Sequence, residues 1–309
     1  MKVWVGIDVA KDSLSVWLRP LDRSFTVANT LAGYQALVKH CHGHAVQGLL
    51  VESTGGYEQG VVDYCLSNAL PIARIMPQRA RAFANALGKR AKTDPIDASV
   101  LAHCAQVMAL PVVRKTSSER EHLKALVQRR LQVIEQRDDE RRRLTQAYHP
   151  DIRASLVRVI AGFKQELKAL QQAIEALVKH VDTDHAHRLR AVAGVGAVSA
   201  SNLIAFLPEL GELDRRQIAA LVGVAPYNRD SGKHQGKRYI AGGRARVRRV
   251  LYMAMWTVIR CHPEMKARYQ RLVEKGKPKK VALIACLRFF ITQLNAMLRD
   301  GTDWKVATI

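Results

Sequence analysis

The feature that most constrains this chain is an acidic residue at the end of two strand-like apolar stretches. Residues 3–8, Val-Trp-Val-Gly-Ile-Asp, alternate so that the branched residues share one face and Asp8 lies on the other. Residues 48–52, Gly-Leu-Leu-Val-Glu, are continuously apolar up to Glu52, as in a strand that is buried on both faces and ends at a site. An α/β sheet would bring these two strand ends together.

A third acidic stretch, Thr93-Asp94-Pro95-Ile96-Asp97-Ala98, has the pattern of a helix start. We expect Asp94 to be the N-cap, Pro95 the first helical residue and Asp97 part of the first turn. In isolation, such acids are most often explained by capping and by the helix dipole. The two strand ends change that interpretation, because the sheet would bring all of these acids to the same place.

Asp8, Glu52, Asp94 and Asp97 would then form a set of four carboxylates. The members of such a set repel one another unless a divalent cation compensates them, and Mg²⁺ or Mn²⁺ prefers hard oxygen ligands. Two such ions about 4 Å apart are a common apparatus for in-line displacement at a phosphodiester. The acids therefore point to metal-dependent chemistry on nucleic acid.

The charge of the chain indicates an anionic partner. Its 309 residues are enough for two domains, or for one domain with an insertion. They contain 49 Lys and Arg against 27 Asp and Glu, a formal net charge of +22. Nucleic acid is the first candidate partner and an anionic membrane surface the second. Sixteen of these basic residues and only three acids lie from Arg229 to Lys280, so this region is expected to be the main electrostatic contact.

Other composition features favour a cytoplasmic protein that does not associate with membranes. The apolar stretch 281–298 contains Arg288, Gln293 and Asn295, which fits a packed helix better than a bilayer one. The N-terminus enters a strand pattern without a charged and apolar leader. The five cysteines have no short Cys-x-x-Cys spacing, which favours buried thiols over a disulfide framework or a zinc site.

The order of the predicted elements divides the chain. Up to about residue 108, an antiparallel meander and then alternating helices and strands indicate a mixed α/β unit. Long helices follow from about residue 118, with a break at Pro150. From Leu156 to Val181, apolar residues alternate in steps of four and three, which is a heptad seam. The two long helices form an antiparallel hairpin within one chain, or the second helix pairs between chains; in either case we expect a coiled coil and an oligomer.

Two C-terminal features favour contact with a phosphate backbone. Gly194-Val195-Gly196 before an apolar helix resembles the turn of a helix-hairpin-helix element, which presents backbone N–H groups to phosphate, although such turns also occur for packing alone. Residues 223–244 form a loop by their Gly, Pro, Asn and Asp content, with Ser231 between basic residues. By its residue chemistry alone, Ser231 is more often a turn residue than a nucleophile.

Four stretches in order carry a resemblance to a known family: Gly6–Lys11, Glu52–Gly55, Lys92–Ala98 and the loop Pro226–Arg249. Together, and with the heptad segment between the third and the fourth, they resemble the DEDD transposases of bacterial insertion sequences. These recombinases are guided by a noncoding bridge or seeker RNA that the element encodes. The resemblance covers nearly the whole chain.

The resemblance implies three parts. An α/β ribonuclease H-like (RuvC-like) catalytic domain would occupy residues 1–115 and a coiled coil or helical hairpin residues 116–185. A mostly α-helical C-terminal transposase domain, with the helix-hairpin-helix-like element, would occupy residues 186–309. Five catalytic residues are implied, of which the first four would bind Mg²⁺ or Mn²⁺ and the last would be the nucleophile: Asp8, Glu52, Asp94, Asp97 and Ser231.

The resemblance also implies how the protein assembles on DNA. The acids of one subunit would meet the serine of another in a homo-oligomer, a dimer that assembles to a tetramer with donor and target DNA. RNA base pairing would choose the sites, so the protein's own contacts would be mostly to backbone. We expect these contacts from the glycine turn and from basic residues: Lys92, Gly194, Gly196, Arg229, Lys233, Lys237, Arg238, Arg244, Arg246 and Arg248.

The sequence therefore predicts a site-specific DNA recombinase in which Ser231 forms a phosphoserine with the DNA strand. Two other functions fit the residues less completely. A metal-dependent nuclease or Holliday-junction resolvase would use water as its nucleophile and leave Ser231 as a turn residue. A non-enzymatic packaging protein would use only the basic half of the chain.

Overall fold

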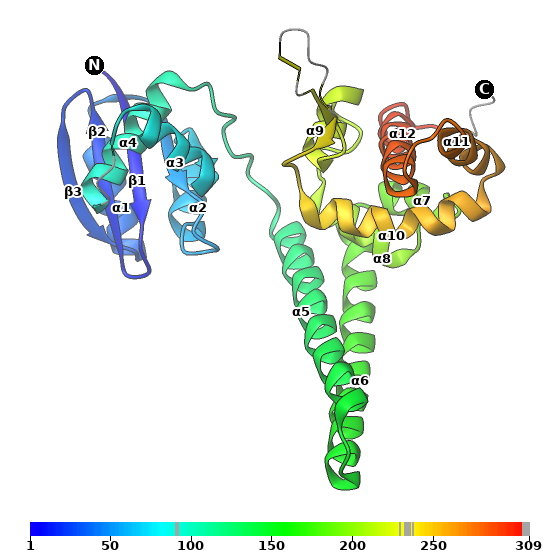
Figure 1. Ribbon diagram of the computed structural model, residues 1–309. Helices are drawn as coiled ribbons and strands as arrows, with labels where there is room; N and C mark the ends of the chain where they lie inside the picture. The colour runs from blue at the N-terminus through cyan, green and yellow to red at the C-terminus, as the bar shows by residue number, and fades with distance from the viewer. Residues whose placement is uncertain (90–92, 229, 232–235, 237, 305–309) are drawn as a thin grey trace. The chain divides into compact units, whose positions relative to one another are not determined.

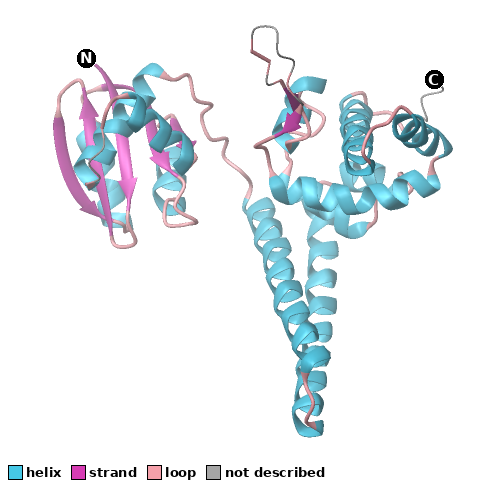
Figure 2. Ribbon diagram, in the orientation of Figure 1, coloured by secondary structure: helices cyan, strands magenta, loops and turns pink. Residues whose placement is uncertain are grey.

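The computed structural model describes residues 1–89, 93–228, 230–231, 236 and 238–304. The chain forms two compact units, Met1–Thr116 and Ser117–Ile309. The first unit contains both strands and helices, whereas the second is mostly helical (Figure 2). A mixed α/β domain followed by a mostly helical region is what the sequence predicts.

The first unit is built on a five-stranded mixed sheet (Figure 1). The strands are adjacent in the order β3-β2-β1-β4-β5. β1, β2 and β3 pair antiparallel as a meander, and β4 and β5 run parallel to β1. Their bounds are β1 (Lys2–Val9), β2 (Ser13–Arg19), β3 (Arg23–Ala28), β4 (Ala45–Glu52) and β5 (Ile72–Ile75).

Helices cover both faces of this sheet because side chains alternate along each strand. On one face, the branched residues of β1 form a core with α1 (Leu31–Cys41) and α2 (Gln59–Ser67). On the other face, side chains of β4 and β5 pack against α3 (Pro77–Ala86) and α4 (Asp94–Val107). Asp8 alternates with the branched residues of β1 and therefore belongs to the α4 face, as the sequence predicts.

The second unit begins with two long helices, α5 (Ser118–Gln146) and α6 (Pro150–Val181), which pack along each other as a hairpin (Figure 1). Of the two arrangements that the sequence leaves open, the structure therefore has the hairpin within one chain. Ile160, Leu170 and Ile174 of the heptad seam are buried. Pairing of hairpins between chains stays a prediction.

Smaller helices pack at the base of this hairpin and share its core. They are α7 (Thr183–Ala191), α8 (Ala197–Phe206), α9 (Arg215–Val222), α10 (Ala245–Cys261), α11 (Pro263–Glu274) and α12 (Lys279–Arg299). Among the described helices, α12 alone is long and apolar enough to cross a membrane by length and composition. Its side chains, Phe290 and Leu294 among them, are buried in this core, so α12 is the central helix of the unit.

One cysteine departs from the prediction that all five are buried. Cys41, Cys65, Cys104 and Cys286 are buried, but Cys261 is exposed. It is the last residue of α10 and follows the buried face formed by Val258 and Ile259.

Candidate active site

Asp8 and Glu52 lie side by side at the ends of two adjacent strands. In the parallel pairing of β1 with β4, Ile7 is opposite Val51. Asp8 and Glu52 are the next residues of these strands, and neighbours in register point to the same face of a sheet. Both are half-buried, so their carboxylates lie at the rim of the unit and not in its core.

Gly6 brings the start of α4 close to these two acids. A Cβ atom at Gly6 would lie 2.0 Å from the carbonyl oxygen of Ala98 and 2.3 Å from the backbone nitrogen of Ala102. Only glycine allows the backbone of α4 to approach β1 this closely. Because Ala98 directly follows Asp97, this contact positions the first turn of the helix, with Asp94 and Asp97, near Asp8.

The electrostatics of Asp8 show that the four acids act on one another. The pKa of its carboxyl is raised to about 6, first by burial and then by the negative charges of Asp97, Asp94 and Glu52. A hydrogen bond from the backbone of Val9 lowers it in part. The structure thus brings the four predicted acids into one mutually repulsive group.

Helix capping does not account for the two acids of α4. The N-cap is Thr93 and not Asp94, because Asp94 is already the first residue of the helix. The predicted N-cap is thus one residue late, and Pro95 is the second helical residue and not the first, a position in the first turn that proline also tolerates. Within the described residues, the carboxylates of Asp94 and Asp97 accept no hydrogen bond, so they are available to a ligand.

The chemistry of this set fits a hard divalent cation, because all four donors are carboxylates. Their arrangement is not yet a ligand shell: in the described part of the chain, no three His, Cys, Asp or Glu side chains are grouped closely enough to hold a metal ion. The carboxylates are within electrostatic range of one another and repel, so a bound cation would draw them together.

A buried acid that the sequence analysis did not single out holds the loop after Glu52. Glu58 is only 7% exposed, and its carboxylate accepts hydrogen bonds from Thr54 N (3.2 Å), Thr54 Oγ1 (2.9 Å) and Gly56 N (2.9 Å). Burial alone would raise the pKa of Glu58, but a hydrogen bond from its own backbone, together with those from Thr54 and Gly56, outweighs burial and lowers the pKa. The loop that leaves the Glu52 strand end therefore has a fixed shape.

Ser231 belongs to the second unit and is exposed. It lies between the short antiparallel strands β6 (Pro226–Tyr227) and β7 (Tyr239–Ile240), in the loop where the sequence predicts it. Asp230, its neighbour, accepts a hydrogen bond from Gly236 N at 3.1 Å and lies 3.8 Å from the Arg238 guanidinium.

Arg248 of α10 ties the two ends of this loop together. Its Nη1 donates to the carbonyl oxygens of Val222 (3.3 Å) and Gly223 (3.2 Å) at one end and of Gly242 (2.8 Å) at the other. Gly223 has a φ of 79°, and a Cβ there would lie 2.1 Å from Arg248 Nη1. Glycine is therefore required where the loop leaves α9, and the ribbon that carries Ser231 has a fixed base.

Three other arginines predicted to contact nucleic acid also serve the fold. Arg244 forms a two-pronged ion pair with Glu209 at 2.5 and 2.6 Å, and Arg246 lies over the ring of Phe206 at 4.4 Å. Arg238 donates to Asn228 Oδ1 at 2.5 Å within the serine loop. Their contact with nucleic acid stays a prediction, and four further predicted contacts lie outside the described residues: Lys92, Arg229, Lys233 and Lys237.

The two glycines of the α7–α8 turn differ. Gly194 has a φ of 94°, and a Cβ there would lie 2.8 Å from a methyl group of Val258. The lack of a Cβ at Gly194 therefore allows this turn to pack closely against α10. Gly196 is the N-cap of α8 and faces open space. A phosphate contact at this turn stays a prediction.

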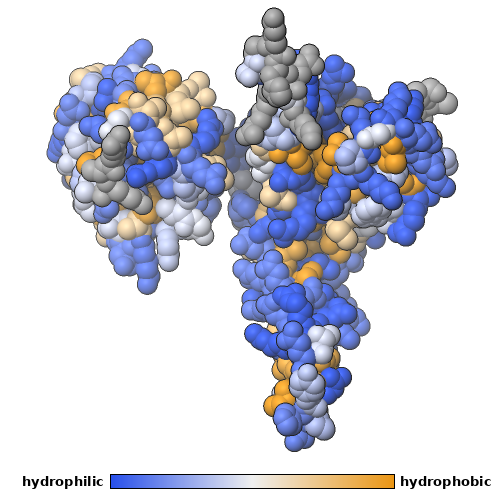
Figure 3. Space-filling model, viewed as in Figure 1, coloured by the Kyte–Doolittle hydropathy of each residue, from blue (hydrophilic) through white to orange (hydrophobic). Residues whose placement is uncertain are grey.

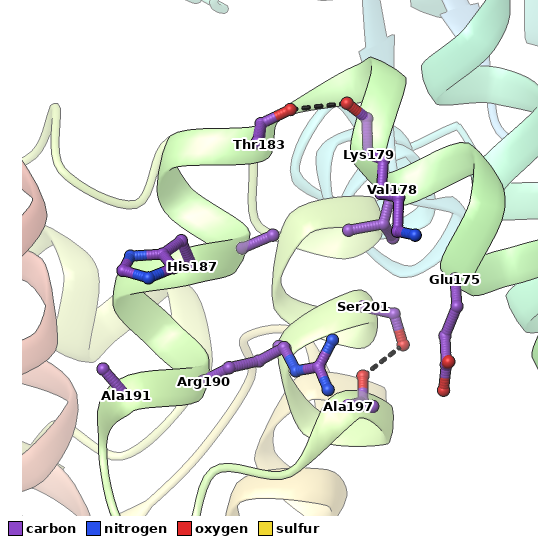
Figure 4. A pocket seen from close by; sticks show the side chains of 11 residues that line it. Glu175, Val178, Lys179, Thr183, His187, Arg190, Ala191, Ala197 and Ser201 are labelled. Carbon is purple, nitrogen blue, oxygen red and sulfur yellow. Dashed lines mark hydrogen bonds between the residues drawn. The ribbon is translucent and has the colours of Figure 1, made fainter.

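A cavity of about 410 Å³ lies among the end of α6, α7 and α8 (Figure 4). Its hydroxyl groups are already satisfied by their own helices: Thr183 donates to Lys179 O, and Ser201 to Ala197 O at 2.8 Å. Among its lining residues, the cavity therefore offers no free hydroxyl nucleophile.

Comparison with known proteins decides the family. A model of the DEDD transposases, described as "Transposase", matches residues 5–148. A second model, described as "Transposase IS116/IS110/IS902 family", matches residues 186–270. The chain belongs to the IS110 family of transposases. The first match contains the four acids and the second contains Ser231.

Relatives of this IS110-family transposase match along nearly its whole length. It is 25% identical to the pilin gene-inverting protein of Moraxella bovis and 24% identical to that of Moraxella lacunata, each over 97% of both chains. An uncharacterized 43.6 kDa protein of the insertion element IS110 of Streptomyces coelicolor is 28% identical over 49% of this chain and 37% of its own. The transposase is thus a DNA transposase or recombinase enzyme, as the sequence predicts.

Proposed function

We propose that this transposase cuts and rejoins DNA through a covalent phosphoserine at Ser231. The observation that carries the proposal is the placement of Ser231, exposed on a ribbon whose base is tied by Arg248. The two Moraxella relatives are named for inverting a gene. Inversion requires that cut strands be rejoined, which favours a covalent intermediate over hydrolysis by water.

In this reaction Ser231 Oγ attacks the phosphorus of a DNA phosphodiester. The Oγ–P bond forms as the P–O bond to the leaving strand breaks, and the leaving oxygen takes up a proton while Ser231 loses one. The hydroxyl of the other duplex then attacks the phosphoserine and releases Ser231 unchanged. The phosphodiester bond energy is conserved, so no further energy source is required.

Asp8, Glu52, Asp94 and Asp97 would hold a divalent cation, which we take to be Mg²⁺ or Mn²⁺. A bound cation of this kind would compensate the charge of the phosphate that is attacked. The close contact of α4 with β1 at Gly6 supports this role, because it brings the first turn of α4 near Asp8. As the family resemblance implies, a composite site in which the acids of one subunit meet Ser231 of another is part of the proposal.

Assembly and targeting complete the proposal. We infer a homo-oligomer, a dimer that becomes a tetramer on donor and target DNA, because the α6 seam leaves Leu156, Phe163 and Leu167 only half-buried. We also infer that a noncoding RNA selects the sites, as the family resemblance implies, and that the protein acts in the cytoplasm. A charge of +22 supports contact with such polyanions.

A covalent-trapping assay tests the mechanism. The protein is incubated with Mg²⁺, the RNA encoded beside its gene and labelled junction DNA, and the products are separated on a denaturing gel. We expect a retarded DNA band that protease removes. The band should be absent with Ser231→Ala, and Asp8→Ala should lose it if the acids and their cation are required.

A different pattern would contradict the proposal. If wild type and Ser231→Ala cut the DNA equally and no protease-sensitive band forms, the protein is a metal-dependent nuclease that uses water. If Asp8→Asn and Asp94→Asn leave every activity intact, the acids are structural and only the basic half of the protein matters.

A further inference from the structure

The exposed side of α10 carries an apolar and basic stripe that the proposed mechanism does not use. The stripe consists of Arg249, Met253, Trp256 and Arg260, at steps of four, three and four residues, and all four are exposed. This spacing places them on one side of the helix, over about 16 Å at 1.5 Å per residue. Met253 is 64% exposed and Trp256 is 45% exposed.

The stripe is separate from the buried core of the unit. α10 already has a complete buried side, which contains Val247, Leu251, Met255 and Val258. Hydrophilic residues dominate the face of this unit seen in Figure 3, and apolar residues break it as separate patches. Two large apolar side chains side by side in such a surface indicate a contact site.

The charge around the stripe selects the partner. α10 contains four arginines and no Asp or Glu. Among the described residues, Arg249 and Arg260 form no ion pair, and Arg260 has only a long hydrogen bond to Thr257 Oγ1, at 3.4 Å. A second copy of this face would bring arginine against arginine in a two-fold contact, which like-charge repulsion disfavours. An anionic partner with flat apolar groups fits both parts of the stripe.

We propose that this stripe, the α10 stripe, binds single-stranded DNA. An unpaired base would stack on the Trp256 ring with Met253 beside it, while Arg249 and Arg260 contact the flanking phosphates. Paired bases are stacked on one another inside a duplex and cannot offer a face to Trp256, so the site requires unpaired DNA. The inference rests on the family's action on DNA and is independent of the phosphoserine at Ser231.

Fluorescence anisotropy with labelled single-stranded DNA of about 16 nucleotides tests the proposal, a length at the upper end of known site sizes. Trp256→Ala should weaken binding about fivefold or more, as the loss of one base–aromatic stack predicts, and Trp256→Phe should restore most of it. Arg249→Gln should reduce the slope of log K against log salt by about 0.7, the value for one phosphate contact on a single strand.

Two control variants show whether a loss of binding is specific to this site. They exclude unfolding of the protein and the removal of any exposed apolar side chain as the cause. Tyr148→Ala removes a 92% exposed aromatic ring from the hairpin of the same unit, and Val281→Ala removes a 51% exposed apolar side chain from α12. Both should bind single-stranded DNA as wild type does. Far-ultraviolet circular dichroism should be the same for all variants, because none of these side chains is in the core.

Four results would overturn the proposal. Unchanged affinity of Trp256→Ala for single-stranded DNA would remove the stacking contact. An equal loss for duplex DNA of the same length would show that the site does not require unpaired bases. A loss confined to RNA of the same sequence would assign the stripe to RNA. A dimer seen by sedimentation in wild type and lost in Trp256→Ala would assign it to a second copy of the chain.

Discussion

Replacing Gly6 with alanine is the sharpest test of how the four acids are brought together. The added Cβ would lie 2.0 Å from Ala98 O and 2.3 Å from Ala102 N, and both are backbone atoms that cannot rotate away. Ordinary contact begins at 3.4 Å. α4 must therefore move from β1 by about 1.4 Å at this contact, and its first turn, with Asp94 and Asp97, moves with it.

This displacement predicts two effects of different size. Overpacking of this kind costs about 1–3 kcal/mol, which lowers the urea midpoint of unfolding but leaves the unit folded. Misplacement of catalytic groups by about 1 Å costs about 100-fold in rate. We therefore expect DNA recombination by Gly6→Ala to fall about 100-fold under conditions in which the folded fraction is unchanged.

Gly48→Ala is the matched control. Gly48 lies in β4, beside β1, and the nearest atom to a Cβ there is Trp4 Cδ1 at 3.9 Å, an ordinary contact. This variant should keep both stability and activity. If Gly6→Ala recombines DNA within about twofold of wild type, or if Gly48→Ala loses as much, the contact of α4 with β1 does not set the position of the acids.

Two further predictions concern charge. In metal-free protein, Asp8→Asn should raise the free energy of unfolding above pH 6, because the ionised Asp8 carboxylate destabilises the fold there. The full pKa shift corresponds to about 3 kcal/mol, which solvent screening of this half-exposed carboxyl reduces to about 2 kcal/mol. Urea unfolding should show that this gain in the free energy of unfolding disappears as the pH falls from 6 to 3.8. A gain that stays constant over this range would refute the prediction. Glu58→Gln should cost about 2 kcal/mol at pH 7, because three hydrogen bonds to a buried carboxylate are weakened. A lowered pKa stabilises fully above the unfolded value of 4.5 and progressively less as the pH falls through the lowered value, so the cost of Glu58→Gln should shrink over that range. Asp63→Asn, at an exposed acid of the same helix, is the control and should change stability little at pH 7.

Much of the first unit follows from its sequence because local pattern and tertiary contact agree there. The alternation along β1 places Asp8 opposite the core of Val3, Val5 and Ile7, and the structure confirms this division. The continuous apolar run before Glu52 matches a strand that has helices on both sides. The close contact of α4 with β1 could not be predicted from this pattern. A glycine at position 6 indicates that space is available beside β1, but not which backbone segment occupies that space.

Glu58 shows why part of the candidate site escaped prediction. It lies four residues after Thr54, at the beginning of a helix, where acids are common for dipole reasons alone. Its role depends on the turn of Gly55 and Gly56, with φ values of 83° and 135°, which directs the loop N–H groups at one carboxylate. Sequence spacing does not report such a turn, so the acid could not be distinguished from an exposed one.

The arginines of α10 have different roles according to their position around the helix. Arg248 and Arg249 are adjacent in sequence and equal in charge, but successive residues of a helix differ by about 100° in direction. Arg248 therefore reaches the carbonyls that close the serine loop, whereas Arg249 points with Trp256 to solvent. A count of basic residues treats both as one electrostatic surface. Their phase relative to the buried side of the helix separates the residue that shapes the loop from the one that is free to meet a phosphate.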